Sequence, residues 1–126
     1  MEIGYTAGPY RAPTIWGVVQ NIRAAEAVAV ELWRLGFGCI CPHKNTALLD
    51  GANGGDGFGD ADVWLKGELE MLRRCDFVVM LPGWERSHGA MAERDFAVKR
   101  GIPVYYWPED RQALERRAER VRAAAV

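Results

Sequence analysis

The segment Leu81–Glu93 holds the residues of this chain whose types and spacing are best suited to chemistry. Pro82–Gly83 turns the chain away from an apolar run, and Ser87 follows at a position typical of a helix N-cap. The serine hydroxyl and the free backbone N–H groups of a helix start form a ready site for phosphate or another anion. His88 and Gly89 belong to this predicted site, where the glycine would let a ligand approach the backbone closely.

Glu93 lies one turn further on, on the helix face that also carries Gly89, Ala90 and Ala97. This face is otherwise small and apolar, so we expect it to pack toward the core. A carboxylate on such a face must be hydrogen-bonded, paired or poised for chemistry. The local pattern leaves two interpretations open: a glutamate that only fills the helix, or a nucleophile or general acid/base.

Further candidate residues follow the first two apolar runs of the chain. Ligands of an open parallel sheet bind outside the carboxyl ends of its strands, so these residues should lie beside Leu81–Glu93. Arg11 could bind a phosphate, with an ordinary surface arginine as the alternative. The candidates are Gly8, Pro9, Tyr10, Arg11, His43 and Asn45.

The elements that must position these side chains alternate along the chain. Strands are predicted at Glu2–Ala7, Gly38–Cys41, Phe77–Leu81 and Pro103–Trp107, and helices at Ile15–Leu35, Ala61–Arg74, Gly89–Arg100 and Glu109–Ala124. This order predicts an α/β fold: a flavodoxin- or Rossmann-like, doubly wound parallel sheet of four or five strands, in the order 2-1-3-4, with helices on both faces. The loop from Lys44 to Gly59, which contains the glycine-rich stretch Asn53–Gly59, predicts a lid, a binding loop or a disordered segment.

Composition narrows the function classes. The 126 residues suit a single domain over 1–126, and a net charge of −1 gives no basic bias toward nucleic acid. No apolar run approaches the roughly 20 residues of a membrane span, and Met1–Gly4 does not start a signal peptide, so we expect a cytoplasmic protein. Cys39, Cys41 and Cys75 are expected to be buried free thiols. No metal and no cofactor is expected.

Three motifs carry a family resemblance. They are Tyr5-Thr6-Ala7-Gly8-Pro9-Tyr10, Glu68-Leu69 followed by Cys75-Asp76, and Leu81-Pro82-Gly83-Trp84 leading into Ser87-x-Gly89-x-x-x-Glu93. Over residues 2–107 the chain resembles the nucleoside 2-deoxyribosyltransferase-like superfamily. Within it, the chain is similar to a small uncharacterised branch of the DUF4406 type and to deoxynucleoside 5′-monophosphate N-glycosidases.

The resemblance implies catalytic roles for three residues. Glu93 would attack the anomeric carbon of the sugar and form a glycosyl-enzyme intermediate, and the Tyr5 hydroxyl would orient it. Glu68 stands where family enzymes usually carry an aspartate near the leaving base, so the carboxylate is kept but its side chain is longer.

The resemblance also implies a binding site and an assembly. Ser87, Gly89 and Arg11 correspond to 5′-phosphate contacts in the branch that hydrolyses deoxynucleoside monophosphates. His43 falls where relatives carry base-pocket residues. Relatives are homo-oligomers, so we expect the same here. The implied partner is a nucleoside or nucleotide rather than a nucleic acid polymer or a membrane.

The expected function is therefore cleavage or transfer at an N-glycosidic bond, by a hydrolase or a transferase. A non-catalytic nucleotide or nucleotide-sugar sensor is the alternative. The chain also loosely resembles the Pro-Gly-Gly-x-Gly-Thr-x-x-Glu loop of cytokinin-activating phosphoribohydrolases. The spacing does not match, however, and the second Gly and the Thr of that loop are absent.

Overall fold

The computed structural model describes residues 1–49, 52 and 61–125. Of the loop from Lys44 to Gly59, for which a lid, a binding loop or a disordered segment was predicted, the glycine-rich stretch Asn53–Gly59 lies outside the described residues. The described strands are β1 (Ile3–Ala7), β2 (Gly38–Ile40), β3 (Phe77–Met80) and β4 (Val104–Tyr106). The helices are α1 (Ile15–Leu35), α2 (Pro42–Asn45), α3 (Ala61–Arg73), the 3-10 helix η1 (Trp84–Arg86), α4 (His88–Lys99) and α5 (Arg111–Ala124).

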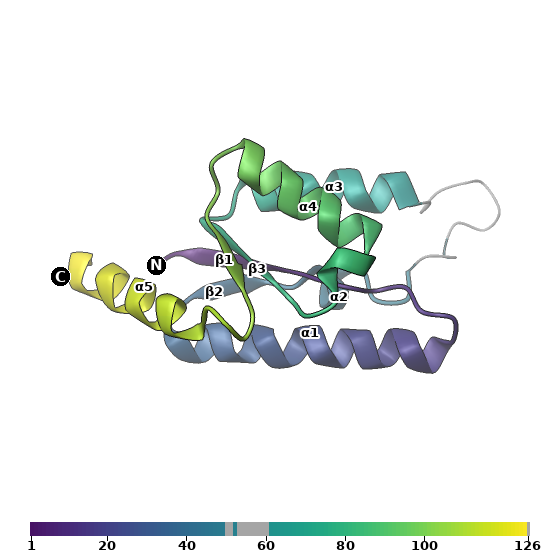
Figure 1. Ribbon diagram of the computed structural model, residues 1–126, viewed down its shortest axis with the longest axis horizontal. Helices are drawn as coiled ribbons and strands as arrows, with labels where there is room; N and C mark the ends of the chain where they lie inside the picture. Colours follow the sequence, from purple (N-terminus) through teal and green to yellow (C-terminus); the bar gives the residue numbers. More distant parts are fainter. Residues whose placement is uncertain (50–51, 53–60, 126) are drawn as a thin grey trace.

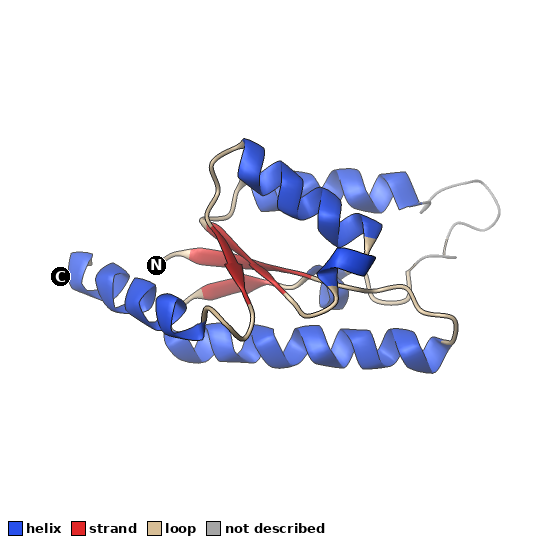
Figure 2. Cartoon of the chain, viewed as in Figure 1, coloured by secondary structure: helices blue, strands red, loops and turns tan. Residues whose placement is uncertain are grey.

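The four strands form one parallel sheet in the order β2-β1-β3-β4, which confirms the predicted fold class and strand order. Helices α1 and α5 cover one face of the sheet, and α3 and α4 cover the other (Figures 1 and 2). All strands run the same way, so their carboxyl ends meet at one edge. The segments that follow β1, β2 and β3 therefore come together there.

Helix α1 shows how the sequence sets the element boundaries. The Thr14 side chain accepts a hydrogen bond from the Gly17 N–H at 3.0 Å and so caps the first turn. Gly36 ends the helix at a φ of 99°, a left-handed conformation that glycine adopts at little cost. Between these ends, Ile22, Leu32 and their neighbours at helical spacing are buried against the sheet.

Two hydrophobic clusters fill the space on either side of the sheet. The cluster on the α1 and α5 side includes Leu32, Phe37 and Phe77. The cluster on the α3 and α4 side includes Tyr5 and Met80. Because side chains of a strand alternate between faces, β1 sends Tyr5 and Ala7 toward α3 and α4.

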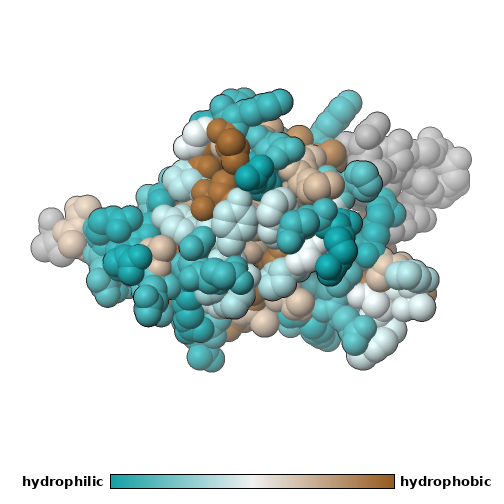
Figure 3. All heavy atoms as spheres, viewed as in Figure 1, coloured by the Kyte–Doolittle hydropathy of each residue, from teal (hydrophilic) through white to brown (hydrophobic). Residues whose placement is uncertain are grey.

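Some sequence expectations differ from the structure. The short elements α2 and η1 were not predicted, because three or four residues carry no readable period. Only Cys75 is a buried thiol, whereas Cys39 and Cys41 are half-buried at the edge strand. Hydrophilic residues cover α5 on the face that Figure 3 shows. Of the helices described, none combines the length and apolar character that a membrane span requires.

We expect the Leu32→Ala substitution to lower the free energy of unfolding by about 2–5 kcal/mol, because it leaves a cavity in a fully buried cluster. Urea denaturation measures this change. Ile15→Ala in the same helix is the control, since Ile15 is 77% exposed and its truncation should cost about 0.5 kcal/mol or less. Equal losses for both variants would contradict this description of the core.

Candidate active site

A cavity of about 400 Å³ lies at the carboxyl ends of β1 and β2, between α2, α3 and the start of α4. Its volume is in the range of small-molecule sites. Most of the candidates identified from the sequence line it, although they come from four separate parts of the chain. These residues are Gly8, Tyr10, Arg11, His43, Glu68, Ser87, His88, Gly89 and Glu93.

Glu93 is the buried carboxyl group of this cavity, with only 5% of its surface exposed. It lies on the α4 face that also buries Ala90 and Ala97, which confirms the inward face predicted from helical spacing. Tyr5, fully buried in β1, donates a hydrogen bond from Oη to Glu93 Oε2. Residues 88 positions apart in the chain thus form one polar pair at the wall of the cavity.

Burial governs the ionisation of this pair. Removal from water raises the pKa of Glu93 to about 8, the hydrogen bond from Tyr5 opposes that rise, and the charge of Glu68 adds to it. The pKa of Tyr5 is raised by burial and then by the charge of Glu93. Tyr5 therefore keeps its proton and acts as a fixed donor, which favours the ionised form of Glu93.

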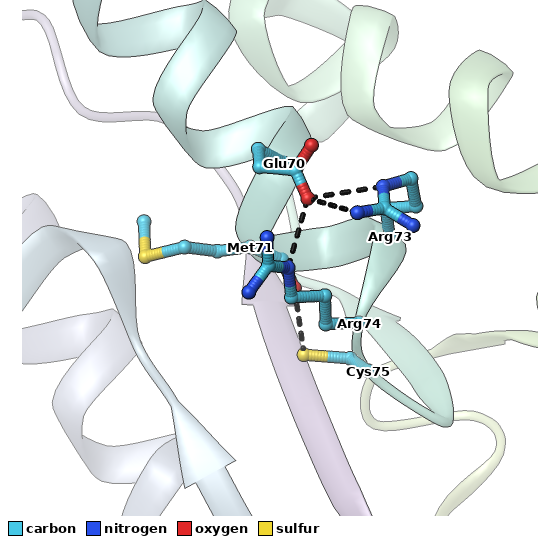
Figure 4. A network of polar contacts seen from close by, with 5 residues as sticks. All are labelled: Glu70, Met71, Arg73, Arg74 and Cys75. Atoms are coloured by element: carbon cyan, nitrogen blue, oxygen red, sulfur yellow. Dashed lines mark hydrogen bonds and ion pairs between the residues drawn. The ribbon is translucent and has the colours of Figure 1, made fainter.

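The second carboxyl group, Glu68, lines the cavity from α3. Burial raises its pKa. Glu70, two residues further on, faces away from the cavity and pairs with Arg73 and Arg74, which lower its pKa (Figure 4). Helix α3 therefore carries one acid whose pKa is raised by burial and, two residues away, one whose pKa is lowered by arginines.

The start of α4 forms the opposite wall. Ser87 Oγ accepts a hydrogen bond from the Ala90 N–H at 3.2 Å, so the predicted N-cap is present. The Ser87 hydroxyl proton stays available to a ligand. A Cβ added to Gly89 would meet no heavy atom within 4 Å, so this glycine leaves cavity space beside the helix start. This geometry suits an anion.

The segment after β1 is held in place from three directions. The Asn21 side-chain amide donates to Tyr10 O at 2.9 Å, and the Leu48 N–H donates to Tyr10 Oη at 2.8 Å. A Cβ at Gly8 would lie 2.7 Å from Leu81 Cβ, so close packing against Leu81, directly after β3, requires this glycine. Arg11 is exposed and lines the cavity with its guanidinium group.

His43 is buried in α2, and its Nε2 lies 2.8 Å from Pro9 O. A carbonyl oxygen only accepts, so Nε2 carries the hydrogen. Burial lowers the pKa of His43, although its backbone partners oppose this change. His43 therefore packs as a neutral ring, 5.8 Å from the Tyr10 ring between centroids. Pro9 contributes through this carbonyl rather than by lining the cavity.

Asn45, a binding candidate from the sequence, does not line the cavity. It lines a separate groove with Glu26 and Trp33, because the turn of α2 directs it away from His43. Sequence reasoning also missed Thr46, Trp64 and Leu65, which line the cavity. The spacing of Trp64, four residues before Glu68 on one helix, could have identified it.

Asp76, from the second resemblance motif, accepts a hydrogen bond from the Ile3 N–H at 2.8 Å at the other end of the sheet. Within the described ranges, no group of three or more His, Cys, Asp or Glu side chains is placed to hold a metal ion.

Comparison with solved structures defines the class of the fold. The chain is similar to the 2-deoxyribosyltransferase of the psychrotolerant bacterium Bacillus psychrosaccharolyticus, with a TM-score of 0.55 and 19% sequence identity, over 82% of this chain and 70% of that one. That protein is described as a biocatalyst for the synthesis of antiviral and antitumoral nucleosides. The likeness confirms the nucleoside 2-deoxyribosyltransferase-like fold.

The family follows from the sequence. The chain belongs to the family described as domain of unknown function DUF4406, whose model matches residues 5–106. This range includes Tyr5, Glu68 and Glu93. No curated protein sequence matches the chain.

We expect Tyr5→Phe to raise the pKa of Glu93 above its value of about 8. The hydrogen bond from Tyr5 stabilises the ionised carboxylate, and the substitution removes it. A carboxyl ¹³C NMR titration would show the midpoint at higher pH. Tyr106→Phe is the matched control, since the Tyr106 hydroxyl accepts from Arg94 instead. An unchanged midpoint in Tyr5→Phe would show that the bond does not favour the ionised carboxylate.

Proposed function

We propose that this chain cleaves or transfers the N-glycosidic bond of a nucleoside or nucleoside 5′-monophosphate, with Glu93 as nucleophile. One observation carries the proposal: a buried glutamate, held by Tyr5, shares a cavity with a second carboxyl group and a helix start suited to an anion. A nucleotide has the matching parts, which are an electrophilic anomeric carbon, a base that needs a proton to leave, and a phosphate.

The reaction begins with ionised Glu93, whose carboxylate oxygen attacks the anomeric carbon. The carbon–nitrogen bond breaks, and its electron pair stays with the base. Glu68 supplies the proton that the departing base requires, a role suited to a carboxyl group whose pKa is raised by burial. The transition state carries positive charge on the sugar, which the Glu93 carboxylate stabilises before forming the ester.

The second half reverses these roles. A water molecule or a second base attacks the anomeric carbon, Glu68 accepts its proton, and Glu93 leaves as the carboxylate. Water gives a hydrolase, and a base gives a transferase. The hydrogen bond from Tyr5 stabilises the carboxylate at both stages.

The anion end of the cavity supports a 5′-phosphate as part of the substrate. Ser87, Gly89 and the backbone N–H groups of α4 lie on one side, and Arg11 supplies the charge. A phosphate bound there would fix the sugar relative to Glu93. His43, Trp64 and Tyr10 offer ring surfaces for the base elsewhere in the same cavity.

We expect Glu93→Gln to lower kcat about 10³-fold or more, because an amide cannot form the glycosyl ester. Base release from a panel of nucleosides and nucleoside 5′-monophosphates, followed by chromatography, measures this. Glu68→Gln should lower kcat about 10²–10⁴-fold, the usual worth of a general acid. The exposed Glu85→Gln is the control. Full activity in Glu93→Gln, or no base release by the native chain, would contradict the proposal.

We expect Ser87→Ala and Arg11→Ala each to raise KM for nucleoside 5′-monophosphates about 10-fold or more, since each removes a hydrogen bond to a charged group. The values for the matching nucleosides should stay unchanged. Arg86→Ala controls for the loss of a nearby exposed cation outside the cavity. An equal rise in KM for nucleosides and for nucleoside 5′-monophosphates would show that Ser87 and Arg11 do not bind a 5′-phosphate.

A binding or sensing role is the second candidate, and the pKa of Glu93 favours it. At about 8, this pKa leaves the carboxyl group largely protonated at neutral pH in the empty cavity. Calorimetric binding of a nucleotide without product after prolonged incubation would support a sensor. Turnover that depends on Glu93 would exclude it.

A further inference from the structure

The two edges of the sheet differ in how they are protected. At the β4 edge, the register with β3 directs the N–H and C=O of Tyr106 away from the sheet. Asp110 satisfies both groups: the Tyr106 N–H donates to Asp110 Oδ2 at 2.8 Å, and the Asp110 N–H donates to Tyr106 O at 2.8 Å. The chain thus closes this part of the edge itself.

The β2 edge has no such closure. Gly38 donates its N–H to Glu2 O at 2.9 Å, and the register with β1 turns Gly38 and Ile40 inward. Alternation then directs the N–H and C=O of Cys39 outward. Across the described residues, no group forms a hydrogen bond to either of them. An open strand edge is a template for pairing with another chain.

An apolar groove flanks this open edge. Val30 and Trp33 of α1 form one side, and Met71 of α3 lies on the other. Trp33 is 57% exposed and Val30 is 44% exposed, although both border a strand. Figure 4 shows the Met71 side chain pointing away from the Glu70–Arg73–Arg74 ion pairs. The groove therefore combines unused backbone groups with apolar side chains on both sides.

We propose that this groove binds a second copy of the chain, by antiparallel pairing of the two β2 strands across a two-fold axis at Cys39. Cys39 turns both its N–H and its C=O outward, so two copies related in this way exchange two Cys39 N–H···O=C hydrogen bonds. A two-fold contact uses the same patch on both copies and closes on itself. Both open edges are then covered without growth into a fibre.

The side chains around the edge match this partner. A three-residue strand cannot bury the roughly 1,200 Å² or more of a stable interface, so α1 must contribute. The two-fold axis brings Val30 and Trp33 of each copy to the shared interface, where an exposed tryptophan is a typical anchor. The charged residues lining the groove, Glu26 and Lys44, pair with each other. Two copies therefore meet without an excess of like charge.

Helix α2 connects this surface to the cavity. Lys44 and Asn45 line the groove, whereas Pro42 and His43 line the cavity. Asn45 therefore has a place in the contact between copies, which accounts for its position outside the cavity. The second copy would support α2 from the side opposite to His43.

Sedimentation equilibrium of the full chain tests the proposal. The native chain should give twice the 14.1 kDa chain mass, and Trp33→Glu should raise the dimer Kd at least about 30-fold. Val98→Glu is the matched control, since Val98 on α4 is 54% exposed and should leave the dimer intact. Thermal melting by circular dichroism of both variants verifies folding.

Hydrogen exchange distinguishes strand pairing from helix contact alone. The Cys39 amide should be protected in the native chain and exchange at least about 10-fold faster in Trp33→Glu. Cys39→Pro removes this outward N–H without removing a β1 bond and should also weaken the dimer.

Three results would overturn the proposal. The first is a native chain that stays monomeric up to about 100 µM, which would leave the groove to a peptide or another protein. The second is a dimer that Val98→Glu breaks and Trp33→Glu does not. The third is a dimer whose Cys39 amide exchanges without protection.

Discussion

The burial of Glu93 is the constraint on which the rest of the site depends. A carboxyl group taken from water needs a partner, and the fold supplies the Tyr5 hydroxyl from the central strand β1. That contact requires α4 to pack its small-residue face against the sheet, with Ala90 and Ala97 beside Glu93. The same packing brings the start of α4 to the carboxyl ends of the strands. One polar pair thus links the core to the cavity.

In and around the cavity, the environment of a side chain shifts its pKa, so that two residues of the same type can differ. Glu68 and Glu70 lie on one helix, yet burial raises the pKa of the first and arginines lower that of the second. His43 is neutral for the same reason, since its buried ring is fixed by a backbone carbonyl. The exposed guanidinium of Arg11 lines the same cavity. The cavity therefore has an acidic wall and an anion-binding wall.

The sheet order also explains why the groove and the cavity lie so near each other. β2 is an edge strand, and the chain leaves it through α2, whose four residues face both hollows. At the outer edge of β4, Asp110 bonds the backbone of Tyr106, whereas no residue that the structure describes does the same for Cys39 at the outer edge of β2. The cavity is proposed as the reacting site, and the groove as the contact between copies.

The sequence by itself determined the alternation of strands and helices, the Ser87 cap and the inward position of Glu93, because each depends on local period or local hydrogen bonding. It also identified the Tyr5 and Glu68 motifs through resemblance. Only the tertiary structure decided that Tyr5 bonds to Glu93, that Trp64 joins the cavity and that Asn45 does not. These facts depend on contacts between distant segments and on the turn of a four-residue helix, neither of which leaves a periodic signal in the chain.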